Sequence, residues 1–339
     1  MLSSKKPLAV TCGEPAGIGP DLTLLAWAQR KPLDLPPFYV RSDPGLLSRR
    51  AQRLGLDMPI HTCHPEDARG IFKSALPVVL TGQPMDDRPG EEQAQTAKTV
   101  ISSIELAVED VAEGRASAVV TNPINKAALY EAGFNHPGHT EFLGALASRY
   151  WPERPASPVM MIAGPSLMVV PVTIHIPLKD VPSRLTADLI IETARIAAED
   201  LKTRFGIAEP RLAFCGLNPH AGEDGKIGQE DRSIIAPAVA RLRAEGLDAR
   251  GPMPADTMFH AEARKTYDCA FGMYHDQVLV PAKTIGFDDS VNVTLGLPFV
   301  RTSPDHGTAY GIAGTGEARV DSFAAALRMA GVLSNPGSV

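Results

Sequence analysis

The sequence predicts an α/β protein with a mixed sheet and two domains, on three observations. Short apolar or β-branched runs alternate with longer segments of helical period, the pattern of a mostly parallel sheet covered by helices. Two apolar runs joined only by a Gly-Pro turn, MMIA and LMVVPVTIH, predict an antiparallel pair within that sheet. The length of 339 residues exceeds what one hydrophobic core normally serves, so we expect two domains.

In the first part of the chain, residues 7–12 (PLAVTC) predict a strand that leads into a helix through residues 21–30. Residues 91–113 place apolar side chains on one stripe at three- and four-residue steps, after opening carboxylates, and predict a long helix. Residues 116–121 (ASAVVT) predict a buried strand. The TNPINK segment after it predicts a turn, with a helix that begins at Lys126.

The second part of the chain continues the alternation after the antiparallel pair. A long helix is predicted over residues 187–206, followed by the strand RLAFC at residues 211–215. A helix over residues 234–246 and the strand CAFGMY at residues 269–274 complete the pattern. No fixed-period repeat or low-complexity linker interrupts it. Domain boundaries are therefore weakly marked.

Composition indicates a folded protein that acts on a small partner. Apolar residues make up 44% and charged residues 21%, which is ordinary globular usage. A net charge of −6 and an aromatic share of 6% give no basic footprint for nucleic acid. No apolar stretch reaches the roughly 18 residues of a membrane span, and the N-terminal run is too short for a signal peptide, so we expect a cytoplasmic protein. The four cysteines are scattered, and disulfides are not expected.

Unusual polar residues follow the predicted strands, where ligands of open α/β sheets bind. His175, His220 and His275 each follow a strand, so the three imidazoles could meet and hold a divalent cation with open positions for substrate. Asp276, next to His275, could orient a ligand or transfer a proton. The alternative is that the three histidines are hydrogen-bonded separately in turns.

Two further segments could bind an anion. His139 and Thr140 stand at the start of a predicted helix, where free N–H groups favour negative charge, although a structural loop is the other interpretation. Lys283 and Arg301, with Asn292 between them in the sequence, could clamp a phosphate or carboxylate. Two unrelated surface charges remain the alternative.

Two glycine-rich stretches differ from the common phosphate motifs. GEPAGIGP near the N-terminus is neither the GxGxxG of a dinucleotide-binding turn nor a GxxxxGK[ST] phosphate loop, and predicts a plain loop. HGTAYGIAGTGEA, residues 306–318, would let the backbone approach a nucleotide closely. Neither stretch identifies a cofactor by itself.

Taken together, the motifs carry a resemblance. GEPAGIGPD, TNPINKAAL, GHTEFL, TIHIPL, GLNPHAGEDGKIGQED, PADTMF, YHDQ, NVTLGLPFVRTSPDHGTA and AGTGEA occur in an order and spacing similar to the 4-hydroxythreonine-4-phosphate dehydrogenase family of vitamin B6 synthesis, over roughly residues 8–330. HGTAYGIAGTG also resembles the adenosine-binding loop of isocitrate and isopropylmalate dehydrogenases. The resemblance implies two α/β/α domains with a cleft between them: residues 1–130 plus 300–339, with the cofactor loop, and residues 131–299, with the metal and dimer contacts.

The resemblance also implies roles for named residues. One divalent ion, Zn, Mg or Co, would be held by His175, His220 and His275 at the interface of a homodimer. Asp276 or Asp256 would remove the substrate's hydroxyl proton. The implied substrate contacts are His139, Thr140, Lys283, Asn292 and Arg301, and the implied contacts of NAD or NADP are His306, Gly307, Thr308, Ala309 and Gly314.

The implied reaction oxidises 4-phosphooxy-L-threonine at C3, with decarboxylation to 3-amino-2-oxopropyl phosphate and CO2, in pyridoxine 5'-phosphate biosynthesis. Because the oxidised product is a β-keto acid, its carbonyl accepts the electrons of the breaking C–C bond. Two alternatives remain: a dehydrogenase of threonate or erythronate 4-phosphate, and a metal-dependent phospho-ligand-binding protein without a redox step. A dihydrodiol of terephthalate, the substrate of another relative, is disfavoured by the phosphate-like clamp residues.

Overall fold

The computed structural model describes residues 6–131, 133–136, 138–154 and 156–335. The remaining residues, which include both ends of the expected terminal domain and Pro137 of the expected anion loop, lie outside the described residues. The chain divides into two compact units. Unit 1 comprises Met1–Pro158 and Leu297–Ser338, and unit 2 comprises Val159–Gly296.

Unit 1 is built on a sheet whose strands follow the order β3-β4-β2-β1-β5-β12. Neighbouring strands of this unit pair in parallel, for example Leu8 with Phe38 and Arg301 with Val119. Its strands are β1 (Leu8–Thr11), β2 (Phe38–Ser42), β3 (Ile60–Thr62), β4 (Leu76–Leu80), β5 (Val119–Val120) and β12 (Arg301–Pro304).

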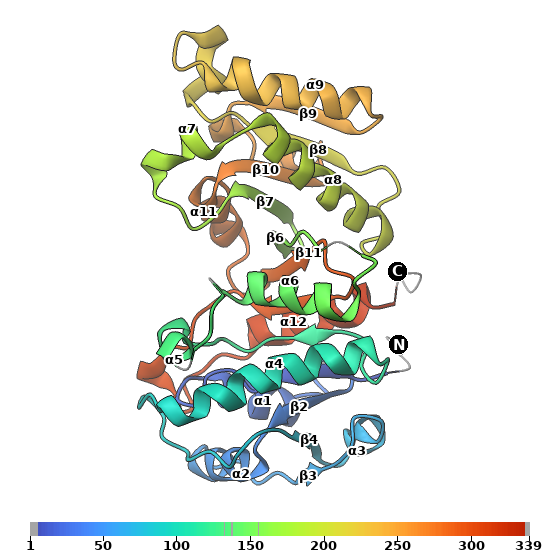
Figure 1. Cartoon of the computed structure of the whole chain (residues 1–339), viewed down its shortest axis with the longest axis vertical. Coiled ribbons are helices and arrows are strands. Elements are labelled where there is room, and N and C mark those ends of the chain that lie inside the picture. Colours follow the sequence, from blue (N-terminus) through green and yellow to red (C-terminus); the bar gives the residue numbers. More distant parts are fainter. Residues whose placement is uncertain (1–5, 132, 137, 155, 336–339) are drawn as a thin grey trace. The chain divides into compact units, whose positions relative to one another are not determined.

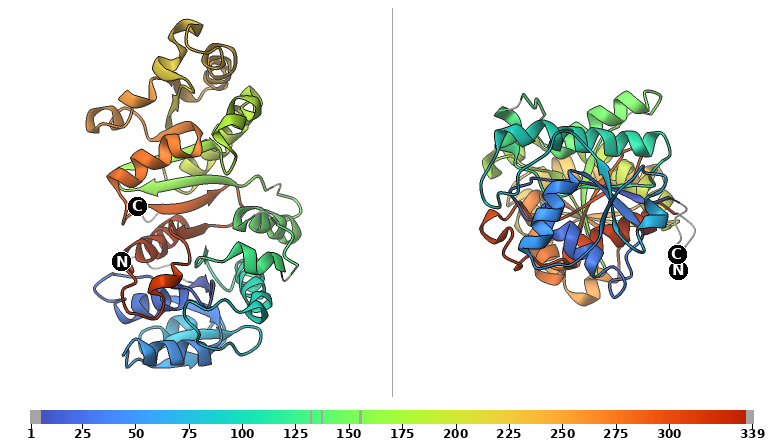
Figure 2. Two further views of the ribbon diagram at one scale, coloured as in Figure 1. Left: turned by 90° about the vertical axis from the view of Figure 1, so that its left-hand side faces the viewer. Right: turned by 90° about the horizontal axis from the view of Figure 1, so that it is seen from below.

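Helices cover both faces of this sheet. In the left view of Figure 2, α4 and α6 lie on one side of the unit 1 strands, and α1 and α12 lie on the other. The helices of unit 1 are α1 (Gly19–Ala28), α2 (Pro44–Arg53), α3 (Ala68–Ile71), α4 (Ala97–Ala112), α5 (Lys126–Glu131), α6 (His139–Tyr150) and α12 (Asp321–Leu333).

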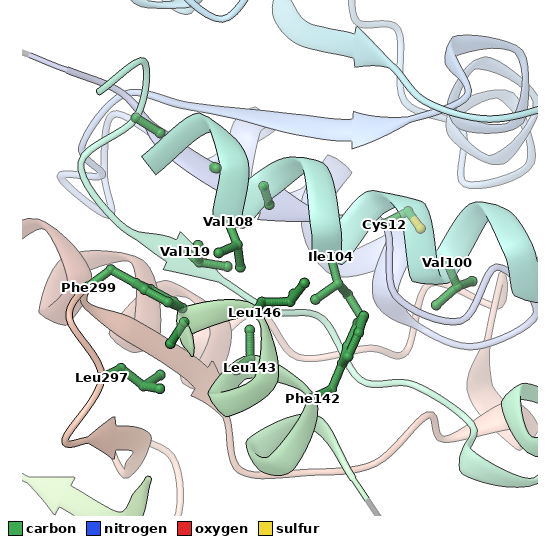
Figure 3. Close-up of a cluster of buried hydrophobic side chains, with 14 of the residues drawn as sticks. Cys12, Val100, Ile104, Val108, Val119, Phe142, Leu143, Leu146, Leu297 and Phe299 are labelled. Atoms are coloured by element: carbon green, nitrogen blue, oxygen red, sulfur yellow. The ribbon is translucent and has the colours of Figure 1, made fainter. Parts of the chain in front are cut away.

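The boundary between the units differs from the predicted domain boundary because α6 packs on α4. Phe142, Leu143 and Leu146 of α6 pack among Ile104 and Val108 of α4, and all are buried (Figure 3). This apolar face of α6 places residues 131–158 in unit 1, whereas the prediction assigned them to the central domain. At the other end, unit 1 resumes at residue 297 rather than 300, because Leu297 and Phe299 join the same core.

The long helix predicted over residues 91–113 begins later than expected. A short 3₁₀ turn spans Ala94–Thr96, and α4 begins at Ala97. Gln93 is extended, with φ −129° and ψ 104°, and Gly90, three residues earlier, donates its N–H to Ala16 O at 2.8 Å. This contact with a distant loop holds the acidic segment outside the helix, so its carboxylates do not form the helix N-terminus.

Unit 2 contains a mixed sheet with the strand order β11-β6-β7-β10-β8-β9. The β11/β6 and β6/β7 pairs are antiparallel, and the rest are parallel, which confirms the predicted Gly-Pro hairpin and the mixed sheet. The strands are β6 (Val159–Gly164), β7 (Leu167–Thr173), β8 (Arg211–Cys215), β9 (Asp248–Met253), β10 (Cys269–Tyr274) and β11 (Val291–Leu295).

Helices also cover both faces of the unit 2 sheet, labelled in Figure 1. In the left view of Figure 2, α11 lies on one side of these strands and α8 on the other. The helices are α7 (Val181–Arg184), α8 (Ala187–Thr203), α9 (Ala236–Ala244), α10 (Ala261–Arg264) and α11 (His275–Ile285). No helix in the described part of the chain is long and apolar enough to cross a membrane.

The four cysteines are free thiols. Cys12, Cys215 and Cys269 are buried among apolar side chains. Burial raises the pKa of Cys12 and of Cys215 to about 12, so neither is a thiolate at neutral pH. These three cysteines therefore act as small core residues.

Candidate active site

Four neighbouring strands of unit 2, β7, β10, β8 and β9, run parallel and end at the same edge of the sheet. His175 follows β7, and His275 and Asp276 open α11 directly after β10. His220 follows β8, and Asp256 follows β9. The carboxyl ends of parallel strands are where open α/β sheets bind ligands. The structure thus brings five side chains that the sequence singled out to one edge of unit 2.

His175 and His275 are neighbours at this edge. Their ring centroids are 5.7 Å apart. His275 Nδ1 lies 2.7 Å from Asp276 Oδ1, a contact that orients the ring and leaves Nε2 for a ligand. Thr173 Oγ1 donates to Met273 O at 2.7 Å, which ties the end of β7 to the end of β10. The relative position of these two imidazoles is therefore set by the sheet.

His220 lies in a turn that winds in the left-handed sense. Residues 220–224 have φ values of 53, 51, 79, 43 and 55°. Four of the five are not glycine, and each costs roughly 1 kcal/mol or more in this conformation. Buried Asp231 stabilises the turn by accepting from the N–H groups of Leu217 (2.8 Å) and Asn218 (3.2 Å). Backbone strain of this kind is typical of functional sites.

Gln277, the last residue of the YHDQ motif, connects two of these segments. Its Oε1 accepts from the N–H of Met273 at 2.7 Å, and its Nε2 donates to Gly216 O at 2.7 Å. The side-chain amide thus holds the start of α11, with His275, against the start of the His220 turn. Its position after the histidine in YHDQ was a signal, but the bridge itself depends on the pairing of β10 with β8.

A pocket of about 880 Å³ opens at the same edge of unit 2. His220, Asp256 and Asp276 line it, together with Asn218 and Tyr274. Its volume lies within the roughly 300–1,000 Å³ of typical small-molecule sites. The pocket can therefore hold a substrate next to one predicted metal ligand and both predicted proton acceptors.

The structure does not assemble all three predicted metal ligands. Within residues that the structure describes, no three His, Cys, Asp or Glu side chains form a group that could hold a metal ion. His220 projects from its own turn with 67% of its side chain exposed, and its Nδ1 lies 3.2 Å from Glu223 Oε1. In donor type the three residues fit a divalent cation, because three imidazole ligands leave coordination positions open for a substrate.

Two predicted substrate contacts also belong to unit 2. Lys283 lies in the last turn of α11 and is half-buried. Asn292 lies in β11, opposite Ile162 of β6, and is also half-buried. Helix α11 therefore carries His275 and Asp276 at its first turn and Lys283 at its last turn.

In unit 1, the predicted anion contacts lie at the N-terminus of α6 and on β12. His139 and Thr140 open α6 after Gly138, which provides no side-chain cap, so backbone N–H groups there can face an anion. Arg301 is only 4% exposed, and its Nη2 and Nε donate to Thr121 Oγ1 at 2.6 and 3.2 Å. Burial lowers the pKa of Arg301 to about 10, so the guanidinium stays charged at neutral pH.

Lys126, which was not among the predicted site residues, adds a second cation beside His139. Its Nζ lies 3.4 Å from where a Cβ on Gly138 would stand. His139 Nε2 is buried with no hydrogen-bond partner. Burial, and then the charges of Arg301 and Lys126, lower the pKa of His139 well below its ordinary value. The imidazole is therefore neutral and its Nε2 can bond an anionic ligand, as an unsatisfied buried polar atom favours.

The lowered pKa of His139 predicts a pH-dependent stability. Because the unfolded chain binds a proton near pH 6.5 and the folded chain does not, the free energy of unfolding should fall as pH drops below about 6.5, by at most about 1.4 kcal/mol per pH unit. His139→Gln, which cannot take up the proton, should remove this dependence. Urea unfolding of both proteins between pH 5 and 7.5 measures it, and parallel pH curves would contradict a buried neutral His139.

The predicted cofactor segment, residues 306–318, forms a loop of unit 1 with one 3₁₀ turn over Tyr310–Ile312. Tyr310 Oη accepts from Asn125 Nδ2 at 2.7 Å. The loop adopts left-handed backbone at Ala309 (φ 47°) and Gly314 (φ 70°). Five residues of this loop were predicted to contact the cofactor: His306, Gly307, Thr308, Ala309 and Gly314.

Known proteins are similar to this chain along nearly its whole length. The family model described as pyridoxal phosphate biosynthetic protein PdxA matches residues 34–330. The 4-hydroxythreonine-4-phosphate dehydrogenase of Xanthobacter autotrophicus is 58% identical over 325 residues, which cover 96% of this chain and 92% of that protein.

Two solved structures are similar. The 4-hydroxythreonine-4-phosphate dehydrogenase of Klebsiella pneumoniae has a TM-score of 0.84 at 36% identity, over 97% of this chain and 98% of that one. A terephthalate 1,2-cis-dihydrodiol dehydrogenase from Burkholderia xenovorans LB400 has a TM-score of 0.63 at 26% identity, over 96% of this chain and 98% of that one. The similarity in sequence and the similarity in fold therefore both lead to the family that the matching model describes.

Proposed function

Because the chain belongs to the PdxA family of pyridoxal phosphate biosynthetic proteins, we propose that it is an NAD- or NADP-dependent 4-hydroxythreonine-4-phosphate dehydrogenase. It would oxidise 4-phosphooxy-L-threonine at C3, and the product would lose CO2 to give 3-amino-2-oxopropyl phosphate. The observation that carries this proposal is the 58% identity to a dehydrogenase of that name over 96% of the chain.

Of the five proposed substrate contacts, three belong to unit 1 and two to unit 2. In unit 1, His139, Thr140 and Arg301 would hold an anionic group of the substrate. The support is local: a buried guanidinium and the uncapped first turn of α6 favour negative charge. In unit 2, Lys283 on α11 and Asn292 on β11 would be the substrate contacts.

We propose that His175, His220 and His275 hold one divalent ion, Zn, Mg or Co. When bound, the ion supplies Lewis-acid polarisation of the substrate's C3 oxygen. The neighbouring rings of His175 and His275, and the location of His220 on the adjacent strand's turn, support this ligand set. Asp276 orients His275 through the 2.7 Å contact.

Asp256 is the proposed base that removes the hydroxyl proton. It lines the same pocket as Asp276 and His220, whereas Asp276 is engaged with His275 Nδ1. A base must reach the proton directly or through one water, and a carboxylate on the pocket wall can do so.

A homodimer, with the metal site at the subunit interface, is part of the proposal. Unit 2 exposes large apolar side chains in the segments that carry two of the proposed ligands. Leu178, just after His175, is 65% exposed, and Val280 on α11 is 62% exposed. Phe287, just after α11, is 69% exposed. Large apolar side chains exposed to this extent favour contact with another protein surface.

The test is nicotinamide reduction by the purified enzyme. With 4-phosphooxy-L-threonine and NAD or NADP, the absorbance of reduced nicotinamide should rise; enzyme treated with a chelator should give no rise, and restoring a divalent metal should restore the rise. Reduction only with threonate or erythronate 4-phosphate would reassign the substrate. Tight binding of these phosphates without reduction of either nicotinamide would instead favour a non-redox binding protein.

A further inference from the structure

The two glycine-rich segments, GEPAGIGP (residues 13–20) and the predicted cofactor loop (residues 306–318), lie side by side in unit 1. Ile18, in GEPAGIGP, donates its N–H to Thr308 O at 2.9 Å. A Cβ on Gly17 would stand 2.7 Å from the same Thr308 oxygen, so only glycine permits this approach. GEPAGIGP, which matches neither common phosphate motif, therefore packs against the cofactor loop at Thr308.

A fully buried arginine organises this supporting segment. Arg50, on α2, has 0% of its side chain exposed. Its guanidinium donates to Pro15 O at 2.9 Å and to Gly17 O at 3.1 Å. It also pairs with Asp21 on α1 and, through Nε at 2.7 Å, with Asp87. This fork of donors fixes two carbonyls of the segment and two carboxylates at once, which a lysine could not do.

Asp21 carries the network on to the cofactor loop. While one carboxylate oxygen pairs with Arg50, the other accepts from the N–H of Gly314 at 2.7 Å. Gly314 is left-handed, and a Cβ there would stand 2.7 Å from Pro89 Cγ and 2.8 Å from Arg53 Cδ. The loop is thus fastened at two points, at Thr308 by Ile18 and at Gly314 by Asp21.

We infer that the Arg50–Asp21 pair is a positioning device for nicotinamide dinucleotide binding. This inference rests on the proposed function, which gives residues 306–314 to the dinucleotide. A buried ion pair is weak evidence for stability by itself, since apolar replacements often stabilise as well. Here Arg50 holds two backbone carbonyls of GEPAGIGP, and Asp21 holds the N–H of Gly314, one of the proposed cofactor contacts, whereas neither side chain is itself a proposed cofactor contact. Their effect is therefore on the shape of the loop.

The test compares two buried arginines of unit 1. Arg50→Lys keeps the charge and loses the fork. Arg41→Lys is the matched control, because Arg41 is also buried and binds Asp110 through Nε (2.8 Å) and Nη2 (2.6 Å). We expect Arg50→Lys to raise the dissociation constant and KM of the nicotinamide roughly tenfold, the size of one lost charged hydrogen bond, with a smaller change in the substrate's KM. Arg41→Lys should lower Tm without that change.

A second pair of variants keeps the inference testable if Arg50→Lys does not fold. Gly17→Ala pushes on Thr308, whereas Gly144→Ala, whose Cβ would stand 2.9 Å from Pro158 Cγ, introduces comparable crowding inside α6. Only Gly17→Ala should weaken nicotinamide binding, measured by titration calorimetry. Equal nicotinamide affinity in wild type, Arg50→Lys and Gly17→Ala would overturn the positioning role alone. Failure of the wild type to bind either nicotinamide would overturn this inference and the proposed function together.

Discussion

Replacement of His220 by alanine should lower kcat by about 10³-fold or more, because loss of a metal ligand removes several kcal/mol of transition-state stabilisation. The fold should survive. The imidazole is 67% exposed, so its removal leaves no cavity, and the neighbouring Ala221 already adopts left-handed backbone in the same turn. The free energy of unfolding should change by about 0.5 kcal/mol or less.

Three measurements on the His220→Ala enzyme separate the possible causes: turnover, metal content after dialysis, and urea unfolding. His61→Ala is the control, since His61 is an exposed histidine of unit 1. Near-normal turnover with full metal content in His220→Ala would remove His220 from the ligand set. A large loss of stability would show instead that the left-handed turn needs the imidazole.

The fold class and most elements were predictable because burial imposes a period on the sequence. The strands 211–215 and 269–274 appear with the predicted bounds, and α8 and α9 lie within their predicted segments. The antiparallel hairpin was predictable from the Gly-Pro turn, which leaves no length for a crossover. The boundary near residue 130 was not, because the apolar face of α6 could have packed on either unit.

The sequence was sufficient to choose candidate site residues, but it did not predict how these residues lie relative to one another. That polar residues follow strands is visible in the sequence, but the adjacency of β7, β10, β8 and β9 depends on long-range pairing. No local pattern predicts left-handed backbone at His220 and Glu223, because the strain is compensated by Asp231 from outside the turn. The burial of Arg50 was likewise not predictable, since an arginine in an amphipathic helix usually faces solvent.

Replacement of Arg301 by lysine should raise the KM for 4-phosphooxy-L-threonine by about 10- to 100-fold, which corresponds to one charged hydrogen bond or a bidentate pair. Lysine retains the charge and most of the volume, but its ammonium cannot bond Thr121 and also present a planar fork to an anion. Because Arg301 is 4% exposed, alanine would leave a cavity and confuse a binding effect with a folding defect.

The kinetic pattern distinguishes substrate binding from structural support. If Arg301 binds the substrate's anionic group, the KM for the phosphorylated substrate should rise while the dissociation constant of the nicotinamide stays near that of the wild type. Thr121→Val removes the hydroxyl that accepts from Arg301 at 2.6 and 3.2 Å, and should cause a smaller rise in the same KM because the guanidinium remains but is less well oriented. A fall in Tm for Arg301→Lys with an unchanged KM would assign this arginine to the core of unit 1. The anion would then depend on Lys126 and the first turn of α6, the other cationic features beside His139.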